Sequence, residues 1–213
     1  MNEALGSSPI GPGRAAYLQR RRDATRASIL QAGRKVFASA NYLQAKIEDI
    51  IKVAHVSRAT FYSYFSTKLD LAYAIYDEIA PQTATLFARL PSLTGKDAVA
   101  MRGWLLEFVG LYVEHRYVTP LIAQLQLFEE SFRERMVDDG DALIALVGEA
   151  GVPSFARALG NDEDAARQRV RARLLFNRVA MVCGQIARGE IAAEHADLWL
   201  DLVGEEMRAF LEE

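Results

Sequence analysis

From about residue 20 to the C-terminus, apolar residues recur at intervals of three and four positions, which is the period of an amphipathic α-helix. A clear case is the stretch from Ile47 to Ala54, where apolar side chains occupy positions i, i+3, i+4 and i+7. No segment alternates apolar and polar residues over a length typical of a β-strand, and no internal repeat is visible. The sequence therefore predicts an all-α protein.

Residues that disfavour helix formation divide this pattern into segments. Residues 1–16 are rich in Gly, Pro and Ser and poor in apolar side chains, so we expect a disordered tail there. The first helix is expected to begin near Arg20 or Thr25 and to end at Ala40. Further helices are expected near residues 47–54, 58–65, 68–79, 97–117, 121–137, 141–159, 162–188 and 191–211, with breaks at Pro81, Pro120, Asp138-Asp139-Gly140, Gly160 and Gly189.

Charge is distributed unevenly along the chain. Residues 1–68 hold eleven Lys and Arg side chains against four Asp and Glu, a net charge of +7, whereas the whole chain carries −3. The remaining residues therefore carry −10. A basic N-terminal region followed by an acidic remainder is typical of a polyanion-binding module attached to a domain with another task.

The sequence gives little support for an enzyme, a metal site or a secreted protein. Cys183 is the only cysteine, so no disulfide forms within the chain, and its apolar neighbours favour an unreactive thiol. The three histidines are far apart, and no P-loop, nucleophile elbow or H-E-x-x-H motif occurs. We therefore expect no catalysis, no cofactor and no metal. Without a signal peptide or a membrane-spanning apolar run, a cytoplasmic protein with no membrane contact is expected.

A helix-turn-helix is predicted within residues 25–70. Ser57 is a good N-cap for a short helix that begins at Arg58, and only a tight turn separates this helix from the preceding one. Phe61 and Phe65 are expected to face inward. Three helices with a tight turn between the last two form a helix-turn-helix, whose second helix lies in the major groove of DNA.

The same region carries a specific motif, which reads Ile29-Leu30-x-Ala32, Phe37-Ala38, Tyr42, Ile47-x-Asp49-Ile50 and Val56-Ser57-Arg58-x-Thr60-Phe61-Tyr62-x-Tyr64-Phe65-x-x-Lys68. This motif resembles the DNA-binding domain of TetR-family transcription regulators. The resemblance implies a helix-turn-helix domain at residues 17–68 and a helical ligand-binding and dimerisation domain at residues 69–213. It also implies a homodimer that binds double-stranded operator DNA and acts as a repressor that a small-molecule effector releases.

Three positions depart from the family pattern. Asn41 at the end of the first helix and His55 in the turn stand where the family commonly has glycine, and Ala45-Lys46 replaces a Thr/Ser pair. Positive φ at a non-glycine residue costs on the order of 1–2 kcal/mol, although Asn and His tolerate it better than most. Lys46 opposes the dipole of the helix that follows, and a bound phosphate would reverse this effect. An exposed lysine of no consequence is the alternative.

Eight residues are candidate DNA contacts. Arg58 has the planar fork that matches O6 and N7 of guanine, while the methyl groups of Ala59 and Thr60 suit a thymine methyl. The alternatives are a phosphate or solvent contact for Arg58 and a packing role for Tyr64. The arginines at 20–22 either reach the adjacent backbone or minor groove or form a solvated face. The eight candidates are Lys46, Ser57, Arg58, Ala59, Thr60, Tyr62, Tyr64 and Lys68.

Two apolar surfaces are expected in the C-terminal domain. One is suited either to plain core or to a pocket for a small apolar or aromatic effector, and comprises Trp104, Phe108, Tyr112, His115, Gln124, Phe128 and Phe176. The other is wide enough to pack against a partner subunit as well as the core, and comprises Leu175, Val179, Val182, Leu198, Trp199 and Leu202, with Leu174 and Met181 on a further stripe. The alternatives are a wholly intramolecular bundle, and a ligand-independent regulator whose C-terminal domain only dimerises or binds a protein partner.

Overall fold

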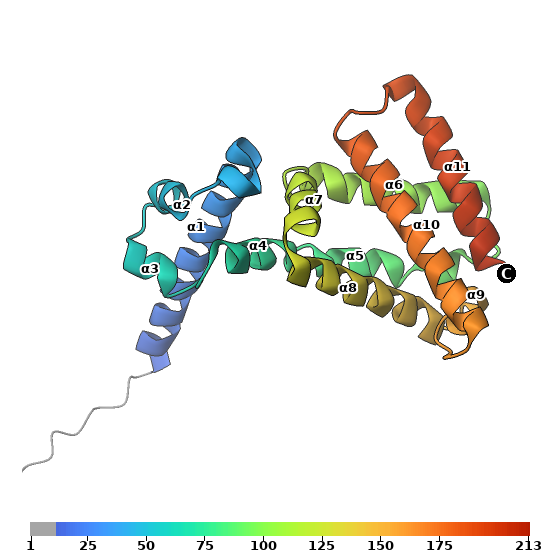
Figure 1. Cartoon of the computed structure of the whole chain (residues 1–213), viewed down its shortest axis with the longest axis horizontal. Helices are drawn as coiled ribbons and strands as arrows, with labels where there is room; N and C mark the ends of the chain where they lie inside the picture. Colours follow the sequence, from blue (N-terminus) through green and yellow to red (C-terminus); the bar gives the residue numbers. More distant parts are fainter. Residues whose placement is uncertain (1–11) are drawn as a thin grey trace, which may run out of the picture.

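The computed structural model describes residues 12–213, and all regular secondary structure in this range is helical, as predicted. Figure 1 shows α1–α4 as a head at one end and α5–α11 as a body at the other. No helix in this range is long and apolar enough to span a membrane. The elements are α1 (Pro12–Gln44), α2 (Ile47–Ala54), α3 (Arg58–Tyr62), α4 (Lys68–Tyr76), α5 (Ala80–Phe87), the 3₁₀-helix η1 (Leu90–Leu93), α6 (Ala98–Glu114), α7 (Val118–Phe128), α8 (Glu130–Glu149), α9 (Pro153–Arg157), α10 (Glu163–Ala187) and α11 (Ala193–Leu211).

The head is organised around α1, against which α2, α4 and α7 pack. Ile29, Ile50 and Phe61 are fully buried in its core. A Cβ atom at Gly33 would lie 2.8 Å from the side chain of Leu71, so glycine at this position lets α4 approach α1 closely. Apolar residues of α7 and α8 complete the same core, which means that the head and the body share packed side chains rather than a flexible linker.

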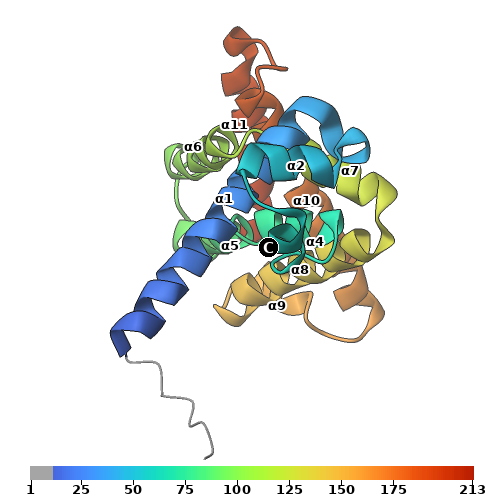
Figure 2. The ribbon, with the colours of Figure 1, turned by 90° about the vertical axis from the view of Figure 1, so that its left-hand side faces the viewer.

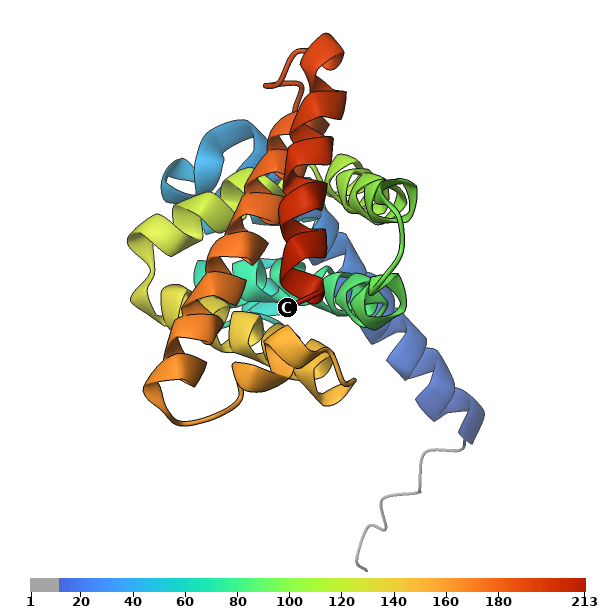
Figure 3. The ribbon, with the colours of Figure 1, turned by 90° about the vertical axis from the view of Figure 1, so that its right-hand side faces the viewer.

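The body is organised around α10, which packs against α6, α8, α9 and α11. Figure 3 shows α10 and α11 side by side on the end of the molecule opposite the head. The ring of Phe176 lies 4.4 Å from that of Phe87 and 5.5 Å from that of Phe155, measured between centroids. Cys183 is buried in this core, where burial raises the pKa of its thiol to about 12. The thiol therefore stays protonated at neutral pH, as an unreactive core cysteine would.

Several predicted helix boundaries are wrong. Because α1 begins at Pro12, residues 12–16 of the expected tail are helical, while residues 1–11 lie outside the described residues. The helix expected over 58–65 ends at Tyr62, and the segment 68–79 is interrupted after Tyr76. The 3₁₀-helix η1 had no recognised sequence signal.

The predicted break at residues 138–140 is also wrong, because α8 continues through it and the chain breaks at Glu129 instead. Asp and Gly inside a helix each cost less than about 1 kcal/mol, so tertiary contacts readily override them. Asp139 accepts a hydrogen bond of 2.7 Å from the Tyr76 hydroxyl, and Asp141 accepts two from the Arg173 guanidinium. These bonds hold the acidic side chains in place along a continuous helix.

Both residues that replace the expected glycines have positive φ. His55 has φ 54° and ψ 41°, the left-handed conformation that closes α2 and starts the turn. Asn41 has φ 53° and ψ 167°, a region populated almost entirely by glycine, and it kinks α1. Its side-chain oxygen accepts a hydrogen bond of 3.1 Å from the backbone N–H of Gln44, which offsets part of the strain.

We expect Asn41→Gly and His55→Gly to raise the free energy of unfolding, the first by about 1 kcal/mol and the second by up to about 1 kcal/mol, because glycine removes the cost of positive φ. Urea denaturation measures both changes. Asn161→Gly is the control, because Asn161 has negative φ. Glycine relieves no strain there and makes the unfolded chain more flexible, so this variant is expected to be less stable than wild type. A loss of stability at His55 would mean that its side chain makes a contact that outweighs the backbone strain.

Candidate DNA-binding surface and ligand cavity

The N-terminus of α3 is exposed and is fixed by a side-chain cap. The Ser57 hydroxyl accepts a hydrogen bond of 3.0 Å from the Thr60 backbone N–H and lies 2.8 Å from the Thr60 hydroxyl. Phe61 and Phe65 face inward as predicted and anchor α3 and the loop after it to the head core. The cap orients the first turn of α3 so that Arg58 and Ala59 face solvent.

Arg58 is exposed but has a partner. Its Nη1 atom donates a hydrogen bond of 2.6 Å to Oε1 of Glu48 in α2, and its guanidinium lies 5.5 Å from the centre of the Tyr62 ring. The Glu48 pKa is lowered by a hydrogen bond from its own backbone N–H and by Arg58. Glu48, which the sequence interpretation did not single out, thus holds the one arginine at the start of α3 in a defined position.

The other candidate contacts differ in how freely they reach solvent. Lys46 is the exposed N-cap of α2, and its side chain makes no capping bond. Tyr62 is 41% exposed on α3. Tyr64 is half-buried and packs against the head core, so the packing alternative has structural support. Lys46, Arg58, Ala59 and Tyr62 are therefore all exposed, as is the capped turn at Ser57.

Lys68 is held by the protein itself. Its Nζ atom donates hydrogen bonds to the backbone oxygens of Tyr42 at 2.6 Å and Ala45 at 3.1 Å, where α1 ends and α2 begins. It also lies 4.4 Å from the centre of the Tyr42 ring. Partial burial lowers the Lys68 pKa. The DNA contact expected of Lys68 remains a prediction, whereas in the structure its ammonium joins the end of α1 to the start of α2.

We expect Lys68→Met to lower the free energy of unfolding by about 1–3 kcal/mol, because two partly buried carbonyl groups lose a charged donor while the apolar stem is largely retained. Urea denaturation of the variant measures this loss. The control is Lys52→Met on α2. The Lys52 ammonium is exposed and has a single weak ion pair, at 3.8 Å from Asp49, so the free energy of unfolding is expected to change by no more than about 0.5 kcal/mol. Equal losses in the two variants would contradict this role of Lys68.

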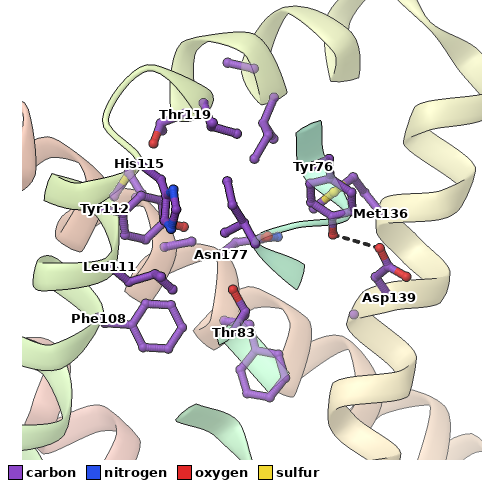
Figure 4. A pocket seen from close by; sticks show the side chains of 18 of the residues that line it. Tyr76, Thr83, Phe108, Leu111, Tyr112, His115, Thr119, Met136, Asp139 and Asn177 are labelled. Carbon is purple, nitrogen blue, oxygen red and sulfur yellow. Dashed lines mark hydrogen bonds between the residues drawn. The ribbon is translucent and has the colours of Figure 1, made fainter. Parts of the chain in front are cut away.

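A cavity of about 460 Å³ lies inside the body, between α4, α5, α6, α7, α8 and α10 (Figure 4). Most of its wall is apolar or aromatic, including Phe87, Phe108, Leu111 and Phe176. The wall also includes polar side chains, among them those of Thr83, Tyr112, His115, Thr119, Asn177 and Gln185. Such a wall is typical of a small-molecule site, in which apolar surface supplies affinity and a few polar groups fix orientation.

The two charged residues of the cavity wall are engaged by protein groups. The Tyr76 hydroxyl donates a hydrogen bond to Asp139, which is drawn in Figure 4. Burial is the larger cause that raises the Tyr76 pKa, and this hydrogen bond is the second. Arg188 donates two hydrogen bonds, of 2.6 and 2.7 Å, to Glu190. Burial also raises the pKa of Tyr112 to about 12. Both phenols are therefore neutral at physiological pH, and Asp139 and Arg188 each have a protein partner of their own.

Four of the seven predicted ligand contacts line the cavity, namely Phe108, Tyr112, His115 and Phe176. Trp104 lies deeper in the body core, where its indole N–H donates to Leu86 at 2.9 Å. Gln124 is on the opposite face of α7, and its side chain accepts from the Tyr42 backbone N–H at 2.6 Å. Phe128 is half exposed at the end of α7, outside the cavity.

The sequence interpretation did not include Asn177 of the cavity wall, and it missed two further wall residues, Tyr76 and Asp139, because they belong to segments assigned other roles. Tyr76 lies on the helix that joins head to body, and Asp139 falls in the supposed break of α8. The spacing of apolar residues contains no signal for either position. Only the fold brings them to the same cavity.

The six predicted dimerisation residues separate into two groups. Leu175, Val179 and Val182 are buried in the core of their own chain. The other three lie on the outer side of α11 and are exposed, with Leu198 at 59% and Leu202 at 54%. Val170, Leu174 and Met181 are exposed on the adjacent side of α10. We call the exposed set the outer stripe; it comprises Val170, Leu174, Met181, Leu198, Trp199 and Leu202.

Comparison with known proteins agrees with this architecture. Residues 29–75 match the model of the bacterial regulatory proteins of the tetR family. Over 193 residues the chain is 29% identical to the transcriptional regulator AcuR of Cereibacter sphaeroides, covering 87% of this chain and 76% of AcuR.

Solved structures share the fold over most of the chain. A TetR-like transcriptional regulator from Rhodococcus superposes with a TM-score of 0.60 at 20% identity, covering 86% of this chain and 93% of the other. A putative TetR-family regulator from Mesorhizobium loti gives 0.59 at 17% identity, with 90% and 96% covered. Residues 29–75 thus match the DNA-binding region of the tetR family, and the all-helical fold of the described chain is similar to that of TetR-family transcriptional regulators.

Proposed function

We propose that the chain is a repressor that binds operator DNA as a homodimer and is released by a small uncharged molecule bound in the body cavity. In this proposal residues 17–68 form the DNA-binding domain and residues 69–213 the ligand-binding and dimerisation domain, with α4 spanning the boundary. The observation that carries the DNA-binding part is the exposed, Ser57-capped start of α3. A helix presented in this way enters the major groove with its first residues toward the base edges.

The cavity supports an effector-responsive regulator over one whose body only dimerises. Its volume of about 460 Å³ is in the range of sites that enclose small organic molecules. The Nδ1 atom of His115 is buried at this wall without a hydrogen-bond partner among the described residues, so it is available to pair with a polar group of a ligand. With Asp139 and Arg188 already paired, the fitting ligand is largely apolar, uncharged, and equipped with one or two hydrogen-bonding groups.

Two helices connect the cavity with the head. Tyr76 of α4 is part of the cavity wall, and the same helix packs against α1. One face of α7 lines the cavity through Thr119 and Ile122, while Gln124 on its other face bonds to Tyr42 of α1. A ligand that shifts α4 or α7 therefore moves the head, and in a dimer this changes the separation of the two recognition helices.

The test begins with selection of duplexes from a randomised library by the wild-type protein. A pseudo-palindrome with half-sites about one helical turn, or a multiple of it, apart is expected. A panel of uncharged aromatic and aliphatic compounds is then screened by thermal shift, and compounds that stabilise the protein are expected to release the selected duplex.

Ala180→Phe, which places a ring in the cavity, is expected to abolish the compound-induced shift while DNA binding is retained. Ala88→Phe, at the exposed end of α5, is the control and is expected to respond like wild type. If no duplex is enriched, the DNA-binding part of the proposal is wrong. If stabilising compounds leave the duplex bound, the effector part is wrong and the ligand-independent alternative is favoured.

A further inference from the structure

The N-terminal part of α1 extends well beyond the head. Residues 13–24 are helical and all exposed, and Figure 2 shows this segment of α1 leaving the rest of the molecule. We call residues 13–24 the α1 extension. Twelve helical residues span about 18 Å. The segment continues a helix whose later turns are packed in the head, so it needs no separate nucleation, and its own side chains remain in solvent.

The α1 extension is strongly basic. It contains Arg14, Arg20, Arg21 and Arg22 but only one acidic residue, Asp23, whose carboxylate accepts a hydrogen bond from Gln19. Within the part of the chain that the structure describes, none of these arginines forms an ion pair. Their charge is therefore free to interact with a polyanion.

Helical spacing directs two of these arginines toward the helix-turn-helix side of α1. Arg22 precedes Arg26 by one turn and Ile29 by two, and Ile29 faces the head core. The Arg26 guanidinium lies 5.6 Å from the ring centre of Phe65, just beyond α3. Arg22 therefore lies on the same face of α1 as Arg26 and Ile29, one turn further from the head.

A second row leads from the extension to the turn. Arg21 lies two turns before Ser28, whose hydroxyl donates a hydrogen bond of 3.3 Å to the backbone oxygen of Ala54, directly before His55. Arg20 belongs to neither row and points to the opposite side of α1. Arg21 and Arg22 thus lie on the side of α1 that faces α3 and the turn before it, whereas Arg20 does not.

We infer that the α1 extension lies along the DNA phosphate backbone next to the groove entered by α3, with Arg21 and Arg22 as its phosphate contacts. This inference rests on the proposed DNA binding and adds a contact surface outside the helix-turn-helix. With one phosphate per strand every 3.4 Å of DNA axis, a segment of about 18 Å passes at most about five phosphates. The extension supplies affinity and salt dependence, and α3 supplies sequence preference.

The test compares Arg21→Gln/Arg22→Gln with Arg20→Gln/Lys96→Gln on the duplex selected by the wild-type protein. Both variants lose two positive charges at exposed positions. In the control variant, however, Arg20 points away from the head, and Lys96 lies in the body before α6. Dissociation constants are measured between about 50 and 200 mM salt, with thermal unfolding as a check on the fold. Hydroxyl-radical footprints report which stretch of backbone is protected.

The Arg21/Arg22 variant is expected to bind at least about tenfold more weakly near physiological salt. The slope of its log affinity against log salt should be shallower by about three to four units, because four phosphate contacts per dimer are lost at about 0.9 each. Its footprint should shorten, while the control stays within about one unit of wild type. Identical slopes and footprints for both variants overturn the inference. If the wild type selects no duplex at all, the proposed function fails instead.

Discussion

Replacing Arg58 with alanine is expected to weaken binding to the selected operator about 10- to 100-fold and to remove discrimination at one base pair of each half-site. The reason is geometric. Arg58 is the first residue of α3, its guanidinium is exposed, and a planar fork matches two acceptors of guanine in the major groove. Binding curves on the selected duplex and on duplexes with single base-pair changes measure both effects.

Glu48 makes the test of Arg58 sharper. In the structure its carboxylate accepts from Arg58, so Arg58 must leave this partner or share it when it reaches a base. Glu48→Gln removes one negative charge, which both competes for Arg58 and repels the nearby phosphates. It is expected to tighten binding about two- to fivefold, opposite in direction to Arg58→Ala. If Arg58→Ala weakens all duplexes equally, Arg58 contacts a phosphate and the docking of α3 needs revision.

The sequence predicts well those features that depend on neighbouring residues. The repeat of Ile47, Ile50, Ile51 and Ala54 specifies α2, and Ser57 caps α3 through the N–H group three residues later. Each of these features is determined within a few residues of chain, which is why sequence alone was sufficient. The positive φ of His55 was expected instead from the family resemblance, because glycine is common at this turn position.

Features that depend on distant parts of the chain were not predictable in this way. Asp139 and Gly140 look like a helix break until Tyr76, more than sixty residues earlier, bonds to Asp139. Trp104 and Phe108 share one apolar face of α6, yet only Phe108 lines the cavity, whereas Trp104 is packed within the body core. Helical periodicity identifies a buried face but does not distinguish solid core from cavity wall.

The last two helices illustrate the same limit, and they lead to the second large expected effect. Periodicity identified an apolar surface on more than one side of α10 and α11, but it did not reveal which side faces the core. The structure shows Val179 and Val182 inside, and the outer stripe, with Leu174 at 60% exposure, outside. Adjacent exposed apolar residues on two long helices are typical of a subunit interface in which two helix pairs form a four-helix bundle.

Leu202→Glu is expected to convert the dimer to a monomer at micromolar concentration and to weaken operator binding at least about 100-fold. In a two-fold interface each substitution occurs twice, so two carboxylates are buried or brought close together. A single recognition helix contacts few base pairs, and tight binding requires both half-sites. Because Leu202 is 54% exposed in the chain itself, its replacement is expected to leave the fold intact.

Light scattering measures the mass of the variant, circular dichroism its helix content, and titration with the selected duplex its affinity. Val99→Glu is the matched control, because Val99 is 77% exposed on α6 and is outside the outer stripe. This control should remain dimeric and bind DNA like wild type. A Leu202→Glu protein that is still dimeric and binds tightly would show that the subunits meet through another surface. A monomeric variant that nevertheless binds the operator tightly would separate dimerisation from DNA recognition and contradict the two-half-site model.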